Sequence, residues 1–126
     1  MNIRVYYEDT DTGGVVYHSN YINFCERARS EVFFKMGLSP ALEDGHFVAK
    51  KIVADYKSSA RLGDLLEVKT KLLEMKGASF TLEQVIYKDD KKIFEMKIVL
   101  VYVTLDGKPQ RLDDKMKTFI KSVFDS

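Results

Sequence analysis

The spacing of apolar residues along this chain changes from a helical period to a strand period. Apolar side chains recur every three or four positions after Ser19, which predicts an amphipathic helix over residues 20–36. Ser19 or Asn20 is expected to cap its start, because a short polar side chain accepts from the free N–H groups there. Gly37 is expected to end it. The apolar positions of this helix are Tyr21, Phe24, Cys25, Ala28 and Val32.

Elsewhere apolar and polar residues alternate, which is the pattern of a half-buried strand. The alternation is imperfect across Lys50, and the second half of the last strand is apolar on both faces, so we expect that end to be covered twice. Helical spacing returns at the end of the chain and predicts a short helix over residues 112–124. The predicted strands are residues 3–7, 48–56, 66–72, 80–86 and 94–103.

Short turns connect the last four predicted strands, and short turns join antiparallel neighbours. A helix packed on one face of an antiparallel sheet makes an α+β fold. The sequence therefore predicts five antiparallel strands, one long helix and a short C-terminal helix. One helix covers only part of such a sheet, so a second copy of the chain is the simplest partner for the rest, and we expect a homo-oligomer.

Length and charge narrow the class of protein. The 126 residues are expected to form one domain, residues 1–126. The 20 Lys and Arg residues balance 19 Asp and Glu, and a net charge of +1 argues against a nucleic-acid-binding protein. A single cysteine forms no internal disulfide, which favours the reducing cytoplasm. We expect no signal peptide or transmembrane segment, because the longest apolar run, residues 98–103, is far shorter than the roughly 20 residues of a membrane helix.

An acidic, glycine-rich loop, Asp9-Thr10-Asp11-Thr12-Gly13-Gly14, stands shortly before the predicted helix. The free N–H groups of a helix start attract developing negative charge, and a carboxylate nearby could attack a carbonyl or activate water. Two other readings stay open on the residues alone. The loop begins like a calcium-binding EF-hand, although Asn20 stands where that loop needs a glutamate. The two aspartates could also serve only to make turns or cap the helix.

The run Asp11-x-x-Gly14-x-Val16-Tyr17-x-x-Asn20-Tyr21, followed by Glu26, resembles the active-site signature of the 4-hydroxybenzoyl-CoA thioesterase family. Residues 7–11, Tyr17-His18 and residues 26–29 are similar to its Tol-Pal-associated subgroup of acyl-CoA thioesterases, known as YbgC. The resemblance implies a hotdog fold, in which a long antiparallel sheet wraps around a central helix. It also implies dimers, often paired into tetramers, with active sites at the subunit interface.

The resemblance further implies roles for single residues. Asp11 matches the catalytic carboxylate, which acts as nucleophile or general base. His18 matches the helix-start N–H that polarises the thioester carbonyl, and its imidazole is also implicated. Tyr7 is a supporting catalytic residue, and Tyr17 and Asn20 lie where substrate binds.

The implied reaction is hydrolysis of an acyl-CoA thioester to a carboxylic acid and CoA, with CoA as part of the substrate and no metal or other cofactor. CoA carries phosphates, so Lys57 and Arg61 are candidates for binding them. An acyl-carrier-protein thioesterase and a non-catalytic acyl-CoA or lipid-binding module are the alternatives. Cys25 lies on the apolar stripe and is expected in the core. His46 is expected in a loop, and two histidines with one cysteine make no convincing zinc site.

Overall fold

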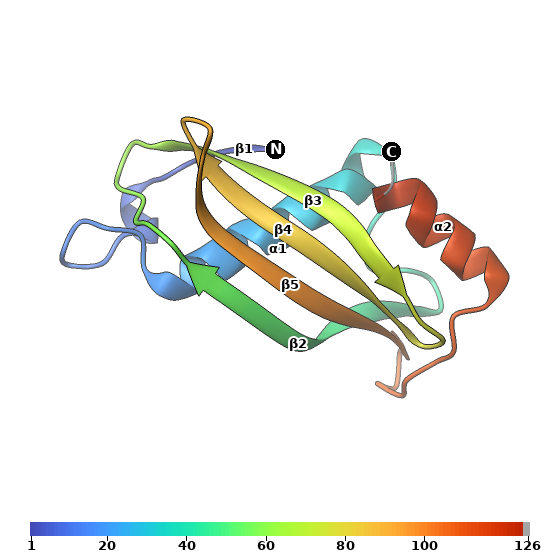
Figure 1. Ribbon diagram of the computed structural model, residues 1–126. Coiled ribbons are helices and arrows are strands. Elements are labelled where there is room, and N and C mark those ends of the chain that lie inside the picture. Colours follow the sequence, from blue (N-terminus) through green and yellow to red (C-terminus); the bar gives the residue numbers. More distant parts are fainter. Residues whose placement is uncertain (125–126) are drawn as a thin grey trace.

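Five antiparallel strands form one sheet in the order β1-β3-β4-β5-β2, and a long helix crosses its concave face (Figure 1). The structure is a computed structural model that describes residues 1–124. The predicted α+β class is confirmed, while the last two residues of the predicted domain lie outside the described part. The elements are β1 (Asn2–Arg4), the 3₁₀ helix η1 (Tyr7–Asp9), α1 (His18–Lys35), β2 (Gly45–Tyr56), β3 (Leu65–Met75), β4 (Ser79–Lys88), β5 (Lys91–Thr104) and α2 (Asp114–Phe124).

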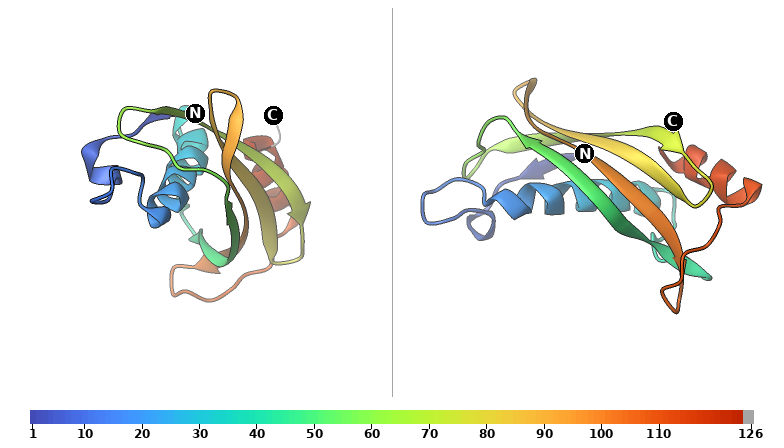
Figure 2. Two further views of the ribbon diagram at one scale, coloured as in Figure 1. Left: turned by 60° about the vertical axis from the view of Figure 1, so that its left-hand side comes forward. Right: turned by 60° about the horizontal axis from the view of Figure 1, so that its bottom comes forward.

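The core fills the space between α1 and the concave face of the sheet (Figure 2). The alternating apolar positions predicted for the last strand all face this core, and each is at most 6% exposed. Burying a Phe, Ile or Leu side chain contributes about 1.5–3 kcal/mol, so this one face of β5 supplies much of the stability. The residues are Phe94, Met96, Ile98, Leu100 and Tyr102.

Two bulges explain where alternation fails. The pairing of β2 with β5 shifts register between Ala49 and Lys51, at the position where the sequence pattern was imperfect. The pairing of β3 with β4 shifts between Leu72 and Glu74. An extra residue in one strand turns the following side chains to the other face, so the two halves of β2 follow different phases.

The ends of several elements differ from the prediction by a few residues. The long helix begins at His18 rather than residue 20, and its N-cap residue, Tyr17, makes no side-chain cap. The predicted capping by Ser19 or Asn20 is therefore wrong, because backbone bonding of the preceding loop, Tyr17 N–H to the carbonyl of Asp9 at 3.0 Å, starts the helix earlier. The first strand ends at Arg4.

The helix does stop where predicted. Gly37 has φ +74°, a left-handed conformation that favours glycine. Its N–H donates to the carbonyl of Phe34 at 3.0 Å, and the N–H of Leu38 donates to that of Phe33 at 2.9 Å. This bonding satisfies the last carbonyls of α1 and reverses the chain toward β2.

The expectation of a doubly covered strand holds only in part. Val103 is 4% exposed, whereas Val99 and Val101 are half-buried on the convex face. The edge strand β2 is exposed along most of its length, including Val53 at 57%. Among residues 1–124, no helix combines the length and apolar character needed to cross a membrane.

Candidate active site

The helix η1, the start of α1 and the end of β2 meet at one end of the molecule (Figure 1). All seven predicted site residues belong to these elements or to the loops next to them, although the Lys57 side chain points elsewhere. The loop before α1 is a small hairpin, in which Asp11 N–H donates to the carbonyl of Val15 at 2.9 Å. Val15 also forms a bridge with Arg61, and Val16 N–H donates to the carbonyl of Ala60 at 2.9 Å. This backbone bonding fixes the acidic loop between the helix start and the turn before β3.

The two aspartates of the loop have different surroundings. Asp9 is 3% exposed, and its carboxylate accepts from the N–H of Tyr6 at 2.9 Å and from the side-chain amide of Asn20 at 3.0 Å. Asp9 therefore ties η1 to α1, which is the turn-making role that the sequence left open. Asn20, predicted to bind substrate, uses its amide in this structural contact.

Asp11 is exposed at the tip of the hairpin. Its Oδ1 accepts from the N–H of Gly13 at 2.8 Å, and its carbonyl accepts from the N–H of Gly14 at 3.1 Å. Gly14 has φ +80°, which the turn requires. The second carboxylate oxygen, Oδ2, has no hydrogen-bond partner within residues 1–124, so it faces solvent and is open to a reacting molecule.

The helix start supplies the complementary charge. The first N–H groups of α1, beginning at His18, have no acceptor inside the helix and carry the positive end of its dipole. The His18 side chain is exposed and its ring lies against Tyr17, with centroids 4.2 Å apart. An oxyanion near these N–H groups would be stabilised.

Two tyrosines that the sequence analysis did not assign to the site fix this helix start. The Tyr56 hydroxyl donates to the carbonyl of His18 at 2.8 Å, and burial raises the pKa of Tyr56. The Tyr21 hydroxyl accepts from the N–H of Ala60 at 2.9 Å, and its ring stacks on Phe94. Both contacts join residues far apart in the chain, so no local pattern could have identified them.

The remaining catalytic candidate, Tyr7, is 81% exposed on η1, with Tyr6, Glu8 and Leu62 lining a shallow surface pocket beside it. Its carbonyl accepts from both the N–H, at 3.1 Å, and the hydroxyl, at 2.9 Å, of Thr10. Because the Tyr7 side chain is so exposed, its phenol is accessible to a ligand at the same end as Asp11.

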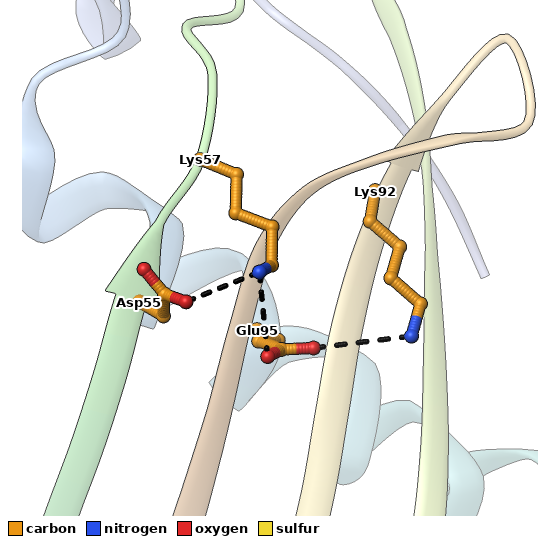
Figure 3. Close-up of polar contacts among 4 residues, drawn as sticks. All are labelled: Asp55, Lys57, Lys92 and Glu95. Atoms are coloured by element: carbon orange, nitrogen blue, oxygen red, sulfur yellow. Dashed lines mark hydrogen bonds and ion pairs between the residues drawn. The ribbon is translucent and has the colours of Figure 1, made fainter.

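The structure does not bring Lys57 to this cluster. Its ammonium lies 3.1 Å from Asp55 and 3.6 Å from Glu95, which also pairs with Lys92 at 3.9 Å (Figure 3). The hydrogen bond to Asp55 and the two carboxylate charges raise the pKa of Lys57. Asp55 and Glu95 are paired across β2 and β5 and lie on the face opposite Tyr56, which contacts the helix. The contacts with these two carboxylates therefore place the Lys57 side chain on the convex face.

Within residues 1–124, no three His, Cys, Asp or Glu side chains come together as metal ligands. Cys25 is fully buried, and desolvation raises the pKa of its thiol to about 12, so it is the core residue that was predicted. His46 lies in β2 rather than in a loop, because strand pairing with Val103 begins earlier than the alternation indicated.

Comparison with known proteins identifies the family of this chain. Residues 5–120 match the model of the thioesterase-like superfamily. A protein of Helicobacter pylori named acyl-CoA thioesterase YbgC is 52% identical over 87 residues, which are 69% of this chain and 65%, just under two thirds, of that protein. The acyl-CoA thioester hydrolase YbgC of Escherichia coli O6:H1 is 39% identical over 87% of this chain and 86% of its own length.

The fold is also that of a solved structure, named a probable thioesterase, from Bartonella henselae. Its TM-score is 0.83 at 33% identity, and the match covers 90% of this chain and 97% of that one. The predicted hotdog fold and the similarity to the YbgC subgroup are therefore confirmed. The chain belongs to the thioesterase-like superfamily.

Proposed function

We propose that this protein is an acyl-CoA thioesterase that hydrolyses a thioester to a carboxylic acid and CoA. The observation that supports the proposal is that the exposed Asp11 carboxylate lies on the hairpin that leads directly into the start of α1, where the first N–H groups are free. The relatives from H. pylori and E. coli, named acyl-CoA thioesterase and acyl-CoA thioester hydrolase, support the same activity.

The chemistry needs only these two elements, because a thioester carbonyl is electrophilic and a thiolate is a good leaving group. As general base, Asp11 takes a proton from water while the water oxygen bonds to the carbonyl carbon. The helix-start N–H groups at His18 hold the oxyanion that forms. The C–S bond then breaks, and the thiolate leaves and takes up a proton to give CoA. As nucleophile, the Asp11 carboxylate would instead attack the carbonyl carbon, and the C–S bond would break to release the CoA thiolate. Water would then hydrolyse the resulting anhydride to the carboxylic acid and regenerate Asp11.

The proposed enzyme needs no metal or other cofactor, and CoA enters as substrate. Arg61 lies beside the hairpin and is the candidate for binding a CoA phosphate. Lys57 lies on the convex face, so it would bind a phosphate only of a CoA that runs along that face or is bound by a second subunit. The cytoplasmic location inferred from the single cysteine stays a prediction.

A homodimer is part of the proposal. Within the described residues, β2 pairs with β5 on one side only, and apolar side chains of this edge, Val48, Ile52 and Val53, are 38–57% exposed. An unpaired edge of this length is a template for another strand. A second copy pairing antiparallel along β2 would extend the sheet, and two such dimers would make a tetramer. Size-exclusion chromatography with light scattering tests this, and a monodisperse monomer at micromolar concentration contradicts it.

A thiol-release assay over a panel of acyl-CoAs tests the activity. We expect Asp11→Asn to lower kcat by at least about a hundredfold, the lower range for loss of a general base. His18→Ala should cost less if only its backbone N–H is needed. Asp106→Asn, in an exposed turn at the other end of the molecule, is the matched control. Near-normal turnover by folded, oligomeric Asp11→Asn would overturn the assignment. Faster hydrolysis of acyl-carrier-protein thioesters, or tight CoA binding without thiol release, would favour the alternatives.

A further inference from the structure

A cavity of about 290 Å³ lies between α1 and the first half of β2, away from the Asp11 hairpin of the same chain. Its volume is near the lower end of the range for small-molecule sites, about 300–1,000 Å³. Most of its wall is aromatic or aliphatic, and the polar exceptions lie on α1 and at the start of β2. The lining includes Phe33, Phe47, Phe80, Leu100 and Phe124, with Glu26, Arg29, Ser30 and His46.

Arg29 is the unusual member of this wall. It is half-buried, and no carboxylate of residues 1–124 lies within 4.0 Å of its guanidinium. Burial lowers the pKa of Arg29, although the pKa of a guanidinium is so high that the group stays charged at neutral pH. Glu26, one turn earlier and exposed, offers a charge that solvent screens.

The guanidinium is held in place from the sheet. Its Nη1 donates to Oε1 of Gln84 at 3.3 Å, and Gln84 is fully buried. The Gln84 amide nitrogen donates to the carbonyl of Cys25 at 2.7 Å and to the hydroxyl of Thr70 at 3.1 Å, which turns its oxygen toward Arg29. A guanidinium has five N–H donors. Within the described residues, the Arg29 guanidinium makes one hydrogen bond to another side chain, that of Gln84.

The proposed dimer brings this cavity to the catalytic end of the partner. The second half of β2 ends at Tyr56, which is bonded to the carbonyl of His18. In an antiparallel, twofold pairing along β2, that end lies beside residues 45–47 of the other copy. Phe47 and His46 line the cavity. In that dimer, the cavity of one subunit would lie next to the helix start of the partner subunit, where the thioester carbonyl would be held.

We propose that this cavity holds the acyl group, and that Arg29 selects acyl groups carrying an acceptor oxygen, as carboxylate or hydroxyl, beyond the thioester. This inference rests on the proposed function and names its substrate class. The physical reason is that a purely aliphatic acyl group would remove water from the guanidinium without replacing its hydrogen bonds, whereas an acceptor oxygen satisfies them. Sites built to hydrogen-bond a substrate discriminate strongly against analogues that lack the bonding group.

The test compares three acyl-CoA series of four to eight carbons, which end in a methyl, a hydroxyl or a carboxylate group. At one length or more, we expect kcat/KM of the wild-type protein to be at least about tenfold higher for a polar end than for the methyl end. Arg29→Met should remove this preference, and Arg29→Lys, with fewer donors, should reduce it. Arg27→Met, an exposed position on the same helix, is the matched control and should leave it unchanged.

Binding separates a failure of this inference from a failure of the proposed activity. Calorimetry measures binding to the wild-type protein, so it depends neither on turnover nor on the folding of a variant. The ligands are three thioethers that cannot be hydrolysed: S-hexyl-CoA, S-(6-hydroxyhexyl)-CoA and S-(5-carboxypentyl)-CoA. Tighter binding of a polar-ended compound by the wild-type protein supports the inference. A methyl preference at every length, or an unchanged preference in folded Arg29→Met, overturns it while hydrolysis of the panel leaves the thioesterase assignment in place. Absence of both hydrolysis and thioether binding overturns both.

Discussion

The different surroundings of Asp9 and Asp11 predict opposite effects of their replacement on stability and on activity. Asp9→Ala removes the acceptor of two hydrogen bonds, from the N–H of Tyr6 and the amide of Asn20, at a site only 3% exposed. A hydrogen bond to a charged group contributes about 1.5–3 kcal/mol. Asn20 is half-buried and can turn to water, so the expected loss is about 2–4 kcal/mol rather than the full sum.

Asp11→Ala should behave in the opposite way. Its carboxylate is exposed and makes one local bond, to the N–H of Gly13, so the loss of stability should be within about 0.5 kcal/mol. Its hydrolysis of acyl-CoA should fall by at least about a hundredfold. Thermal unfolding at fixed protein concentration measures the contrast, since roughly 4 °C per kcal/mol for a chain of this size gives a fall of about 8–16 °C for Asp9→Ala.

Two results would refute this reasoning. If Asp9→Ala melts within a degree or two of the wild-type protein, the buried carboxylate does not hold η1 to α1. If Asp9→Ala, assayed well below its melting temperature, loses activity while Asp11→Ala keeps it, the catalytic and structural roles have been assigned to the wrong members of the pair.

Three further predictions follow from buried or paired groups. Gln84→Leu should lower the free energy of unfolding, measured in urea, by about 2 kcal/mol, because the half-buried Arg29 guanidinium loses its hydrogen-bond acceptor. A change below about 0.5 kcal/mol would contradict this. The thiol of Cys25, with its pKa raised to about 12, should react with a disulfide reagent at least about a hundredfold more slowly in the native than in the unfolded protein; equal rates would show that the core opens there. Burial alone would raise the pKa of Asp64, but the N–H of Arg61 and the Lys88 ammonium lower it below its usual value. A carboxylate whose pKa is lowered by folding stabilises the fold above about pH 4 and ceases to do so as pH falls. The difference in unfolding free energy between wild type and Asp64→Asn should therefore shrink toward pH 2. A difference that does not depend on pH would contradict this prediction.

Much of the fold follows from local pattern. The helical period over α1, the alternation of β3 to β5 and the short turns between them are each properties of consecutive residues, and they determine an antiparallel α+β arrangement. The acidic hairpin was recognisable for the same reason, because its residue types and spacing lie within a short segment. The predicted helix stop at Gly37 needed only the left-handed conformation that glycine adopts readily.

What the tertiary structure decided depends on residues distant in sequence. Asp9 and Asp11 have the same side chain, but Asp9 is buried with hydrogen bonds from Tyr6 and Asn20, whereas Asp11 is exposed. The phase of β2 past its bulge depends on pairing with β5, so the face on which Lys57 lies could not be found from alternation. The burial of Arg29 against Gln84 joins positions 55 residues apart. Periodicity shows which side chains share a face of one element, but the partner of that face is determined by packing of the whole chain.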